Sequence, residues 1–271
     1  MTELERAVEL LRMRDVSYAA RARQRQAYGA VSAARILGLP LPATLARDPR
    51  VHLIVPQGFS SSSPRGTITR IVPQRAWRTF EFDGLLLPSP ELIFCLLARD
   101  LDVMNLLALA DALVTTSHWY PSRRWLGALS TPELLATAAT DWSPCTGASR
   151  LREVLPHIRL RVESPYETMM RFLLEQSGYP TLTVQHLLYD RAGRKVARGD
   201  CADEQARILY DYDGDGHRTS RSQWQKDVRR ARRVATLDWH PERVVLADLW
   251  PNPSAFITHA QDLRARRLAE R

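Results

Sequence analysis

The sequence predicts an α/β protein (in the looser sense that includes α+β), with a mixed central sheet flanked by helices, after a mostly helical N-terminal region with a few short strands. The last hundred residues follow the order helix, three strands, helix, strand, helix. Three successive strands favour an antiparallel meander, and a strand that follows a helix can join the same sheet by a crossover. The 271 residues are 45% hydrophobic and 25% charged, which is typical of one or two globular domains.

The first region is predicted to contain five helices and three strands. The expected helices lie near residues 4–11, at Val31–Leu37, from Ser89 onward, at Leu101–Val114 and at Thr131–Ala139. Ser89 followed by Pro90 has the residue types of a helix cap and a first helical position. The expected strands are Val51–Val55, Thr67–Val72 and Thr79–Phe82.

A domain boundary is predicted in Asp141–Gly147, where Trp, Pro and Gly interrupt the helical pattern, so we divide the chain into residues 1–150 and 151–271. In the second region we expect helices at Ser164–Ser177, Ser220–Leu237 and Ser254–Leu268. The expected strands are Thr181–Tyr189, Lys195–Cys201 and Arg207–Tyr212, between the first two helices, and Arg243–Ala247, between the last two.

The charge balance is strongly basic, since 38 Lys and Arg minus 30 Asp and Glu leave +8. All but Lys195 and Lys226 of the basic residues are arginine, which suits phosphate but is also typical of a GC-rich genome. No apolar run approaches the ~20 residues of a membrane span, and the N-terminus has no signal pattern. Three cysteines without a CxxC exclude a disulfide framework and a cysteine zinc cage. We expect a cytoplasmic protein without a membrane partner.

An acidic cluster interrupts this basic chain. Its members are Asp200, Asp203, Glu204, Asp211, Asp213 and Asp215. A hairpin centred near Gln205–Ala206 sets Asp200 opposite Asp211, whereas a turn centred at Asp203–Glu204 separates them. Adjacent carboxylates repel unless a proton or a cation lies between them, and Mg²⁺ or Mn²⁺ prefers such oxygen ligands. A solvated acidic hairpin is the alternative interpretation.

Motifs around this cluster resemble a known family. Asp211-Tyr212-Asp213-Gly214-Asp215-Gly216-His217-Arg218, followed by Asp227 and Arg230, resembles an "EYDG-x-x-H … D-x-x-R" signature. Asp200 matches the aspartate that opens the superfamily motif, and Ser164-Pro165-Tyr166-Glu167 with Arg171 matches an "SPLE…R" helix. The signature is that of an actinobacterial family of unknown function with a domain similar to the very-short-patch-repair endonuclease, within the PD-(D/E)XK superfamily. In this chain aspartate replaces the family's glutamate at position 211, and Asp213 stands at the place of the motif lysine.

The resemblance spans about Val162 to Leu249 and implies a restriction-endonuclease-like core. More weakly, residues 30–40 and the helices of Ser89–Val114 resemble the region of these proteins that is related to AbiEi-type antitoxins. That similarity implies a first region that binds DNA or a protein partner in a defence or toxin–antitoxin system.

By resemblance, Asp200 and Asp211 are the metal ligands, and Glu167 and His217 assist catalysis. Each has a structural alternative. Glu167 is also the third helical residue after Ser164 and completes a capping box. His217 follows a glycine-flanked turn, where it can act as a general base or be a surface histidine.

A basic helix follows the acidic cluster. Its candidate nucleic-acid-binding residues are Arg218, Lys226, Arg229, Arg230, Arg232 and Arg233. Basic side chains beside a cation site neutralise the phosphates of a bound strand, although a solvated arginine face has the same composition. Arg230 can also pair with Asp227, three residues before it on the helix.

These observations lead to three hypotheses about function. The first is a Mg²⁺-dependent DNA endonuclease that uses Mg²⁺ or Mn²⁺ to hydrolyse phosphodiester bonds. The second is a catalytically silent, DNA-binding regulator or antitoxin-like protein on a nuclease fold. The third is a protein partner in a defence or mobile-element system that does not bind nucleic acid. Metal-dependent cleavage separates the first from the second, and salt-dependent DNA binding separates both from the third.

Overall fold

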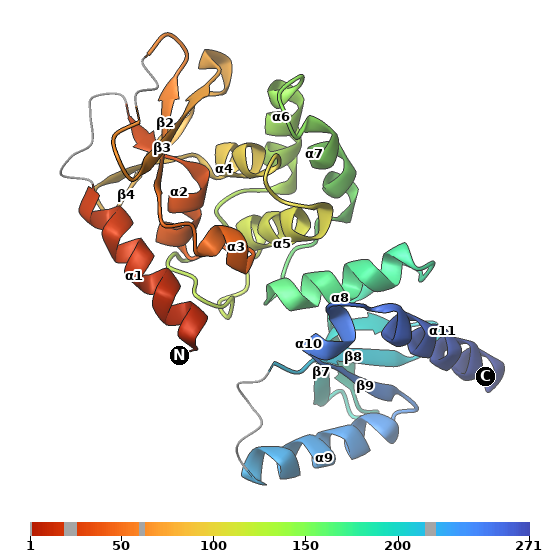
Figure 1. The fold of residues 1–271 in the computed structure, drawn as a ribbon. Helices are drawn as coiled ribbons and strands as arrows, with labels where there is room; N and C mark the ends of the chain where they lie inside the picture. Colours follow the sequence, from red (N-terminus) through yellow and green to blue (C-terminus); the bar gives the residue numbers. More distant parts are fainter. Residues whose placement is uncertain (1, 19–25, 60–62, 215–220) are drawn as a thin grey trace. The chain divides into compact units, whose positions relative to one another are not determined.

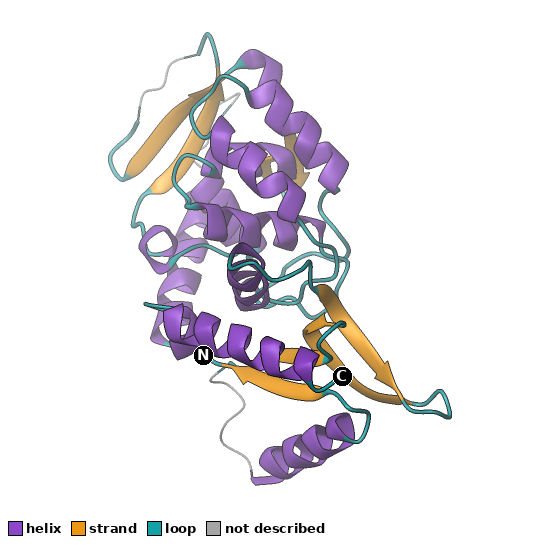
Figure 2. Cartoon of the chain, turned by 90° about the vertical axis from the view of Figure 1, so that its right-hand side faces the viewer, coloured by secondary structure: helices purple, strands orange, loops and turns teal. Residues whose placement is uncertain are grey.

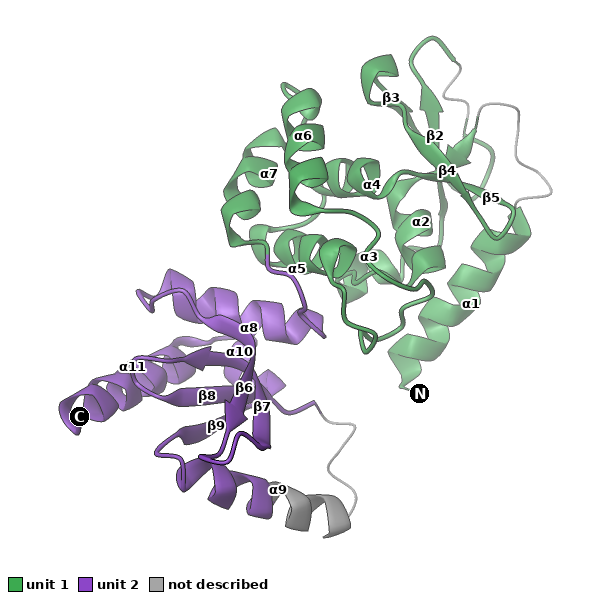
Figure 3. Ribbon diagram, turned by 180° about the vertical axis from the view of Figure 1, so that it is seen from behind, with its two compact units in different colours: residues 1–158 green, residues 159–271 purple. Residues whose placement is uncertain are grey.

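The computed structural model describes residues 2–18, 26–59, 63–214 and 221–271, with only the backbone described for residues 221–227. The chain divides into two compact units, unit 1 (residues 1–158) and unit 2 (residues 159–271) (Figure 3). The division falls after residue 158 instead of residue 150, because helix α7 (Ala148–Val154) buries Leu151 and Val154 within unit 1. Helices make up 45% and strands 19% of the protein, which confirms the mixed α/β class.

Unit 1 combines helices with two small sheets. Its elements are α1 (Glu3–Ser17), β1 (Ala27–Tyr28), α2 (Ala30–Leu37), α3 (Ala43–Ala46), β2 (Val51–Pro56), β3 (Thr67–Val72), β4 (Thr79–Phe82), β5 (Leu85–Pro88), α4 (Pro90–Leu97), α5 (Val103–Val114), α6 (Pro132–Trp142) and α7. Strands β1, β2 and β3 form one sheet, antiparallel at β1/β2 and parallel at β2/β3, and β4 pairs with β5 in a hairpin. Strands β1 and β5 have no counterpart among the predicted elements.

The helices of unit 1 begin where the sequence places capping residues. The Ser89 hydroxyl accepts a hydrogen bond from Leu92 N, as predicted, and Asp102 and Thr131 cap α5 and α6 in the same way. Helices α4 and α5 are apolar on nearly every side and are almost entirely buried. They form the centre of the unit 1 core.

A fully buried ion pair joins α1 to α2. The Nε of Arg35 lies 2.7 Å from Oδ2 of Asp15, and both side chains are 0% exposed. Arg35 also donates to the main-chain oxygens of Asp48 (2.8 Å) and Arg50 (3.0 Å), just before β2. One guanidinium group therefore satisfies polar groups from three segments of unit 1.

Unit 2 is built on a four-stranded sheet of order β6-β7-β8-β9. Its elements are α8 (Pro165–Gln176), β6 (Thr183–Tyr189), β7 (Lys195–Asp203), β8 (Ile208–Tyr212), α9 (Arg221–Ala235), β9 (His240–Val244), α10 (Leu246–Leu249) and α11 (Ser254–Ala269). Strands β6, β7 and β8 are antiparallel neighbours, and β9 joins β8 in parallel after the crossover through α9. The predicted meander and crossover are both confirmed.

Helices cover both faces of this sheet (Figures 1 and 2). On one face, residues of α8, α10 and α11 pack against Cys201, Ile208 and Tyr210. On the other face, Val234 of α9 packs against Ala202 and Leu209. The alternation predicted for β8 is confirmed, because its odd and even positions enter different clusters.

The last strand differs from its prediction. It runs over His240–Val244 instead of Arg243–Ala247, and residues 246–249 form the short helix α10. Pro241 lies within this strand, and β9 is the edge of the sheet, where a residue without an N–H group is tolerated.

Within the described part of the chain, no helix has both the length and the apolar character needed to span a bilayer.

Candidate metal centre

The hairpin of β7 and β8 brings the two predicted ligands together. Its register pairs Cys201 with Tyr210 and Ala202 with Leu209, so the next position sets Asp200 opposite Asp211. The main-chain N–H of Tyr212 donates to Oδ2 of Asp200 at 2.7 Å. This register corresponds to a turn centred at residues 205–206 and excludes the alternative turn centred at residues 203–204.

Glu167 contacts the sheet from the first turn of α8. Ser164 caps this helix by accepting a hydrogen bond from Glu167 N at 3.2 Å. The carboxylate of Glu167 does not complete the reciprocal half of a capping box. Its Oε2 accepts instead from Glu163 N at 3.0 Å and from Nε2 of Gln185, on β6, at 2.9 Å. The side chain of Glu167 is therefore part of the acidic cluster as well as of the helix start.

The environment of Glu167 and Asp200 favours their protonated forms. Burial and the negative charge of Asp200 raise the pKa of Glu167 to about 8. Burial and the charge of Asp211 raise the pKa of Asp200 to about 7. Burial also raises the pKa of Asp211, against the opposing effect of Arg230. In their ionised forms these groups repel one another, and a proton or a cation relieves the repulsion.

Two arginines neutralise the other carboxylates of the cluster. Arg230, on α9, binds both oxygens of Asp211 at 2.7 and 2.9 Å and also donates to the main-chain oxygen of Arg198. Arg198 in turn binds both oxygens of Glu163 at 2.9 and 2.6 Å. Within the described residues, Glu167 and Asp200 form no ion pair. The uncompensated charge of the cluster therefore lies on these two carboxylates.

Gln185 belongs to this cluster, and the sequence analysis did not identify it. Its side chain is 3% exposed, and its Oε1 has no hydrogen-bond partner among the described residues. Its neighbours in β6 pair with β7 on either side, Val184 with Cys201 and His186 with Gly199, so Gln185 lies opposite Asp200. The ladder omits this pair, and Gln185 has a left-handed φ of 51°. No local sequence pattern indicates such a position, because the contact with Glu167 spans 18 residues.

Two stacked tyrosine rings flank the carboxylates. The ring centroids of Tyr166 and Tyr212 lie 4.8 Å apart, with 16° between the planes. Tyr166 precedes Glu167 in the chain, and Tyr212 follows Asp211. The stack therefore fixes the main chain beside both carboxylates.

The remaining predicted site residues fall into two groups. His217 and Arg218 lie outside the described residues, as does the side chain of Lys226. Arg229, Arg232 and Arg233 are exposed on α9 and form no ion pair with any described residue. Arg230 is the exception on this helix, because it binds Asp211 instead of facing solvent. Asp213 pairs with Arg243 at 3.3 Å, and the charge of Arg243 also lowers the pKa of Asp211.

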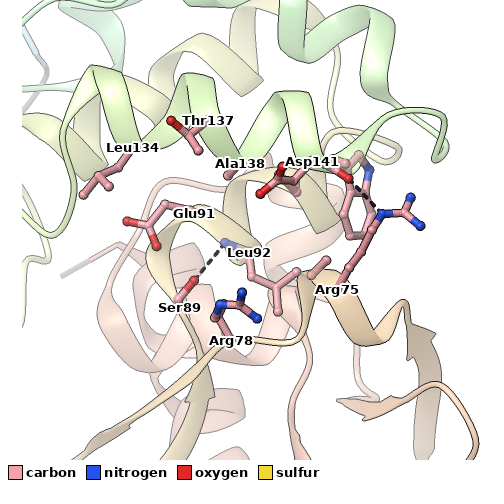
Figure 4. Close-up of a pocket in the computed structure, with 12 residues that line it drawn as sticks. Arg75, Arg78, Ser89, Glu91, Leu92, Leu134, Thr137, Ala138 and Asp141 are labelled. Carbon is pink, nitrogen blue, oxygen red and sulfur yellow. Dashed lines mark hydrogen bonds between the residues drawn. The ribbon is translucent and has the colours of Figure 1, made fainter.

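Unit 1 contains a separate pocket of about 330 Å³ between α4 and α6 (Figure 4). Its apolar lining includes Leu92, and charged side chains lie around it, with Arg75 and Arg78 from the segment before β4, Glu91 on α4 and Asp141 on α6. Arg75 is held by the main-chain oxygen of Asp141 at 3.1 Å. None of the residues predicted from the sequence to act in function lines this pocket.

Comparisons of the chain with protein families, with curated proteins and with solved structures gave no match. Among the described residues, no group of three or more His, Cys, Asp or Glu side chains has the arrangement of a metal site. Two features remain that favour a bound cation. They are the carboxylates of Glu167 and Asp200, which form no ion pair with a described residue, and the amide oxygen of Gln185, which has no hydrogen-bond partner among the described residues.

The metal-free protein is expected to become more stable as the pH falls from about 8 to about 5. Glu167 and Asp200 have folded-state pKa values of about 8 and about 7, well above the ordinary values near 4. Between these limits the folded state binds protons that the unfolded state does not, so acidification favours folding and the gain is lost as the pH rises through 7 to 8. Urea unfolding in EDTA at several pH values measures this, and the difference between wild type and Asp200→Asn isolates it. An identical pH dependence of the two proteins contradicts the prediction.

Proposed function

We propose that the chain is a Mg²⁺-dependent DNA endonuclease whose restriction-endonuclease-like core is unit 2. The observation that carries the proposal is the register that sets Asp200 opposite Asp211 and beside Glu167, where neither Asp200 nor Glu167 forms an ion pair with a described residue. The order α8-β6-β7-β8-α9-β9 is also the order that the sequence resemblance implies. A net negative, half-buried cluster next to an arginine-rich helix suits the hydrolysis of a phosphodiester bond.

In this proposal, Asp200 and Asp211 hold the ion and Glu167 stands beside them. A bound Mg²⁺ supplies charge stabilisation on the phosphate and lowers the pKa of an attacking water. Glu167, with its raised pKa, exchanges a proton near neutral pH and is suited to act on the attacking water. Arg230 fixes the orientation of Asp211 through two hydrogen bonds, and Tyr212 N does the same for Asp200.

A nicking assay tests the proposed activity. Supercoiled plasmid DNA is incubated with the full chain and Mg²⁺ or Mn²⁺, and with EDTA as the metal-free reference. Glu167→Gln keeps the size of the side chain and removes its charge, so this variant is the matched inactive control. We expect nicking by wild type in Mg²⁺ or Mn²⁺ alone, and none by the variant. Equal nicking by the two proteins means that the activity is a contaminant, and the proposal then fails.

The exposed arginines of α9 are proposed to bind the DNA backbone. Replacing Arg229, Arg232 and Arg233 with alanine is expected to weaken DNA binding without sequence bias. It should also reduce the slope of log K against log salt by about one unit for each lost phosphate contact. Fluorescence anisotropy at several salt concentrations measures both effects.

A second triple variant controls for the loss of charge. Arg152, Arg191 and Arg266 are exposed elsewhere and form no ion pair with described residues. Their replacement with alanine lowers the net charge by the same three units, so its salt slope should stay close to that of wild type. If the two triple variants have the same slope, the arginines of α9 make no specific contact.

The alternative function is a catalytically silent, DNA-binding regulator. Arg230 favours this alternative, because it engages both oxygens of Asp211, which leaves Asp211 without a free oxygen for a cation in this conformation. Asp213 at the place of the motif lysine favours it as well. Salt-dependent DNA binding without nicking in any divalent cation supports the regulator and contradicts the endonuclease.

A further inference from the structure

The charges of the acidic cluster leave an imbalance of two. Its carboxylates are Glu163, Glu167, Asp200 and Asp211, and its guanidinium groups are Arg198 and Arg230. When all four carboxyl groups are ionised, four negative charges meet two positive ones. Each guanidinium group already makes a bidentate ion pair, Arg198 with Glu163 and Arg230 with Asp211. One divalent cation would balance the remaining charge of −2, and a neutral additional ligand leaves that balance unchanged.

Gln185 offers a neutral oxygen at this point. Its Nε2 donates to Oε2 of Glu167 at 2.9 Å, which places the whole amide beside the carboxylate. When Glu167 is ionised, the reverse orientation of the amide would set two acceptors against each other, so the oxygen is the atom left over. This Oε1 is buried and has no donor among the described residues. A buried acceptor without a partner is costly, and ligation of a cation removes that cost.

The main chain at Gln185 supports a functional reason for this arrangement. A left-handed φ of 51° is uncommon for glutamine, and the β6/β7 ladder omits the pair formed by Gln185 and Asp200. Strain of this kind persists where the surroundings hold a residue for a purpose. Here the distortion lies opposite Asp200, and the Gln185 amide contacts Glu167.

We infer that Gln185 is a ligand of the proposed divalent cation and supplies its amide oxygen next to the proposed carboxylate ligands, at a point where its Nε2 also holds Glu167. This inference rests on the proposed function, because it assigns a further ligand to the same ion. Amide oxygens and carboxylates are the mixed ligand set that hard divalent cations accept.

Direct Mn²⁺ binding to the full chain at pH 8 tests the inference without reference to cleavage. Free Mn²⁺ is measured by electron paramagnetic resonance for wild type, Gln185→Leu and Gln185→Glu. Gln185→Leu removes the oxygen and is expected to weaken Mn²⁺ affinity at least about tenfold. Gln185→Glu keeps an oxygen and adds a charge, so it is expected to bind Mn²⁺ more tightly than wild type. Gln176→Leu is the matched control, because Gln176 is exposed on α8 away from the cluster.

The outcomes separate this inference from the proposed function. If wild type binds Mn²⁺, Asp200→Asn does not and Gln185→Leu binds as wild type does, the Gln185 assignment is wrong and the proposed function stands. If wild type binds no Mn²⁺, the proposed function itself fails. If Gln185→Leu does not fold, Gln185→Glu decides, and an affinity no higher than that of wild type overturns the inference.

Discussion

Asp200→Asn is expected to abolish both the stabilisation of the protein by Mn²⁺ and the nicking of DNA. The substitution keeps the shape of the side chain but removes an ionic ligand. It also removes the repulsion between Asp200 and its neighbours Glu167 and Asp211, so the metal-free protein should become slightly more stable at pH 8. A site with millimolar affinity stabilises wild type by only ~1–2 kcal/mol at ~10–20 mM Mn²⁺, which a thermal shift resolves.

Asp213→Asn is the control, because Asp213 lies just beyond Asp211 in the chain and is not one of the proposed ligands. Asp213 pairs with Arg243, so its loss should change stability by less than about 1 kcal/mol and leave Mn²⁺ binding intact. If wild type shows no shift with Mn²⁺ or Mg²⁺ and Asp200→Asn behaves identically, the metal site is wrong. If wild type binds the ion but does not nick DNA, the lack of activity is explained by aspartate in place of the family's glutamate at position 211 and by the absence of the motif lysine. That result supports the regulator hypothesis.

Arg35→Met is expected to reduce the free energy of unfolding of unit 1 by about 3–5 kcal/mol. The variant leaves Asp15 as a buried carboxylate without a cation, and it removes two donors from main-chain oxygens. Burial already raises the pKa of Asp15, so protonation of Asp15 should relieve part of the loss. The loss should therefore be smaller at pH 5 than at pH 8 in urea unfolding.

The comparison for this prediction is Arg50→Met. Arg50 pairs with Asp48, but the Arg50 side chain is largely exposed, so the expected loss is much smaller than for Arg35→Met. The double variant Arg35→Met, Asp15→Leu should recover much of the stability, because no charge is then left buried. Equal losses for Arg35→Met and Arg50→Met contradict the special role of the buried pair.

The register of the acidic hairpin was one of two that local rules allowed from sequence, and the structure selects the turn centred at residues 205–206. Strand alternation and the position of the turn together set Asp200 opposite Asp211. Ser164 and Ser89 were predictable as caps because each bond spans three residues. Glu167 was open to two interpretations, and the structure shows that its carboxylate serves the cluster while Ser164 caps the helix.

The contacts that sequence did not indicate are those made between distant elements. The pairing of Arg230 with Asp211 depends on the crossover that brings α9 over the sheet, which local spacing does not indicate. The role of Gln185 depends on α8 lying across β6. Strand β9 starts earlier than predicted, at His240, because it is the edge strand of the sheet and an edge strand can contain Pro241. Each of these is a tertiary effect that no short window of sequence contains.

Gly199 illustrates how packing alone makes a position intolerant to change. A Cβ built at Gly199 would lie 2.3 Å from Cγ of Leu209, so any side chain there displaces Leu209 from the core between the sheet and α9. Gly199 immediately precedes Asp200, and Leu209 lies two residues before Asp211. In a saturation mutagenesis screen scored by activity, substitutions at position 199 would consequently be as damaging as substitutions of the carboxylates, although glycine has no side chain that could bind a metal or act in catalysis. Scoring the same library by soluble yield would separate the two classes, because substitutions at Gly199 should lower the yield and conservative ones at Asp200 should not.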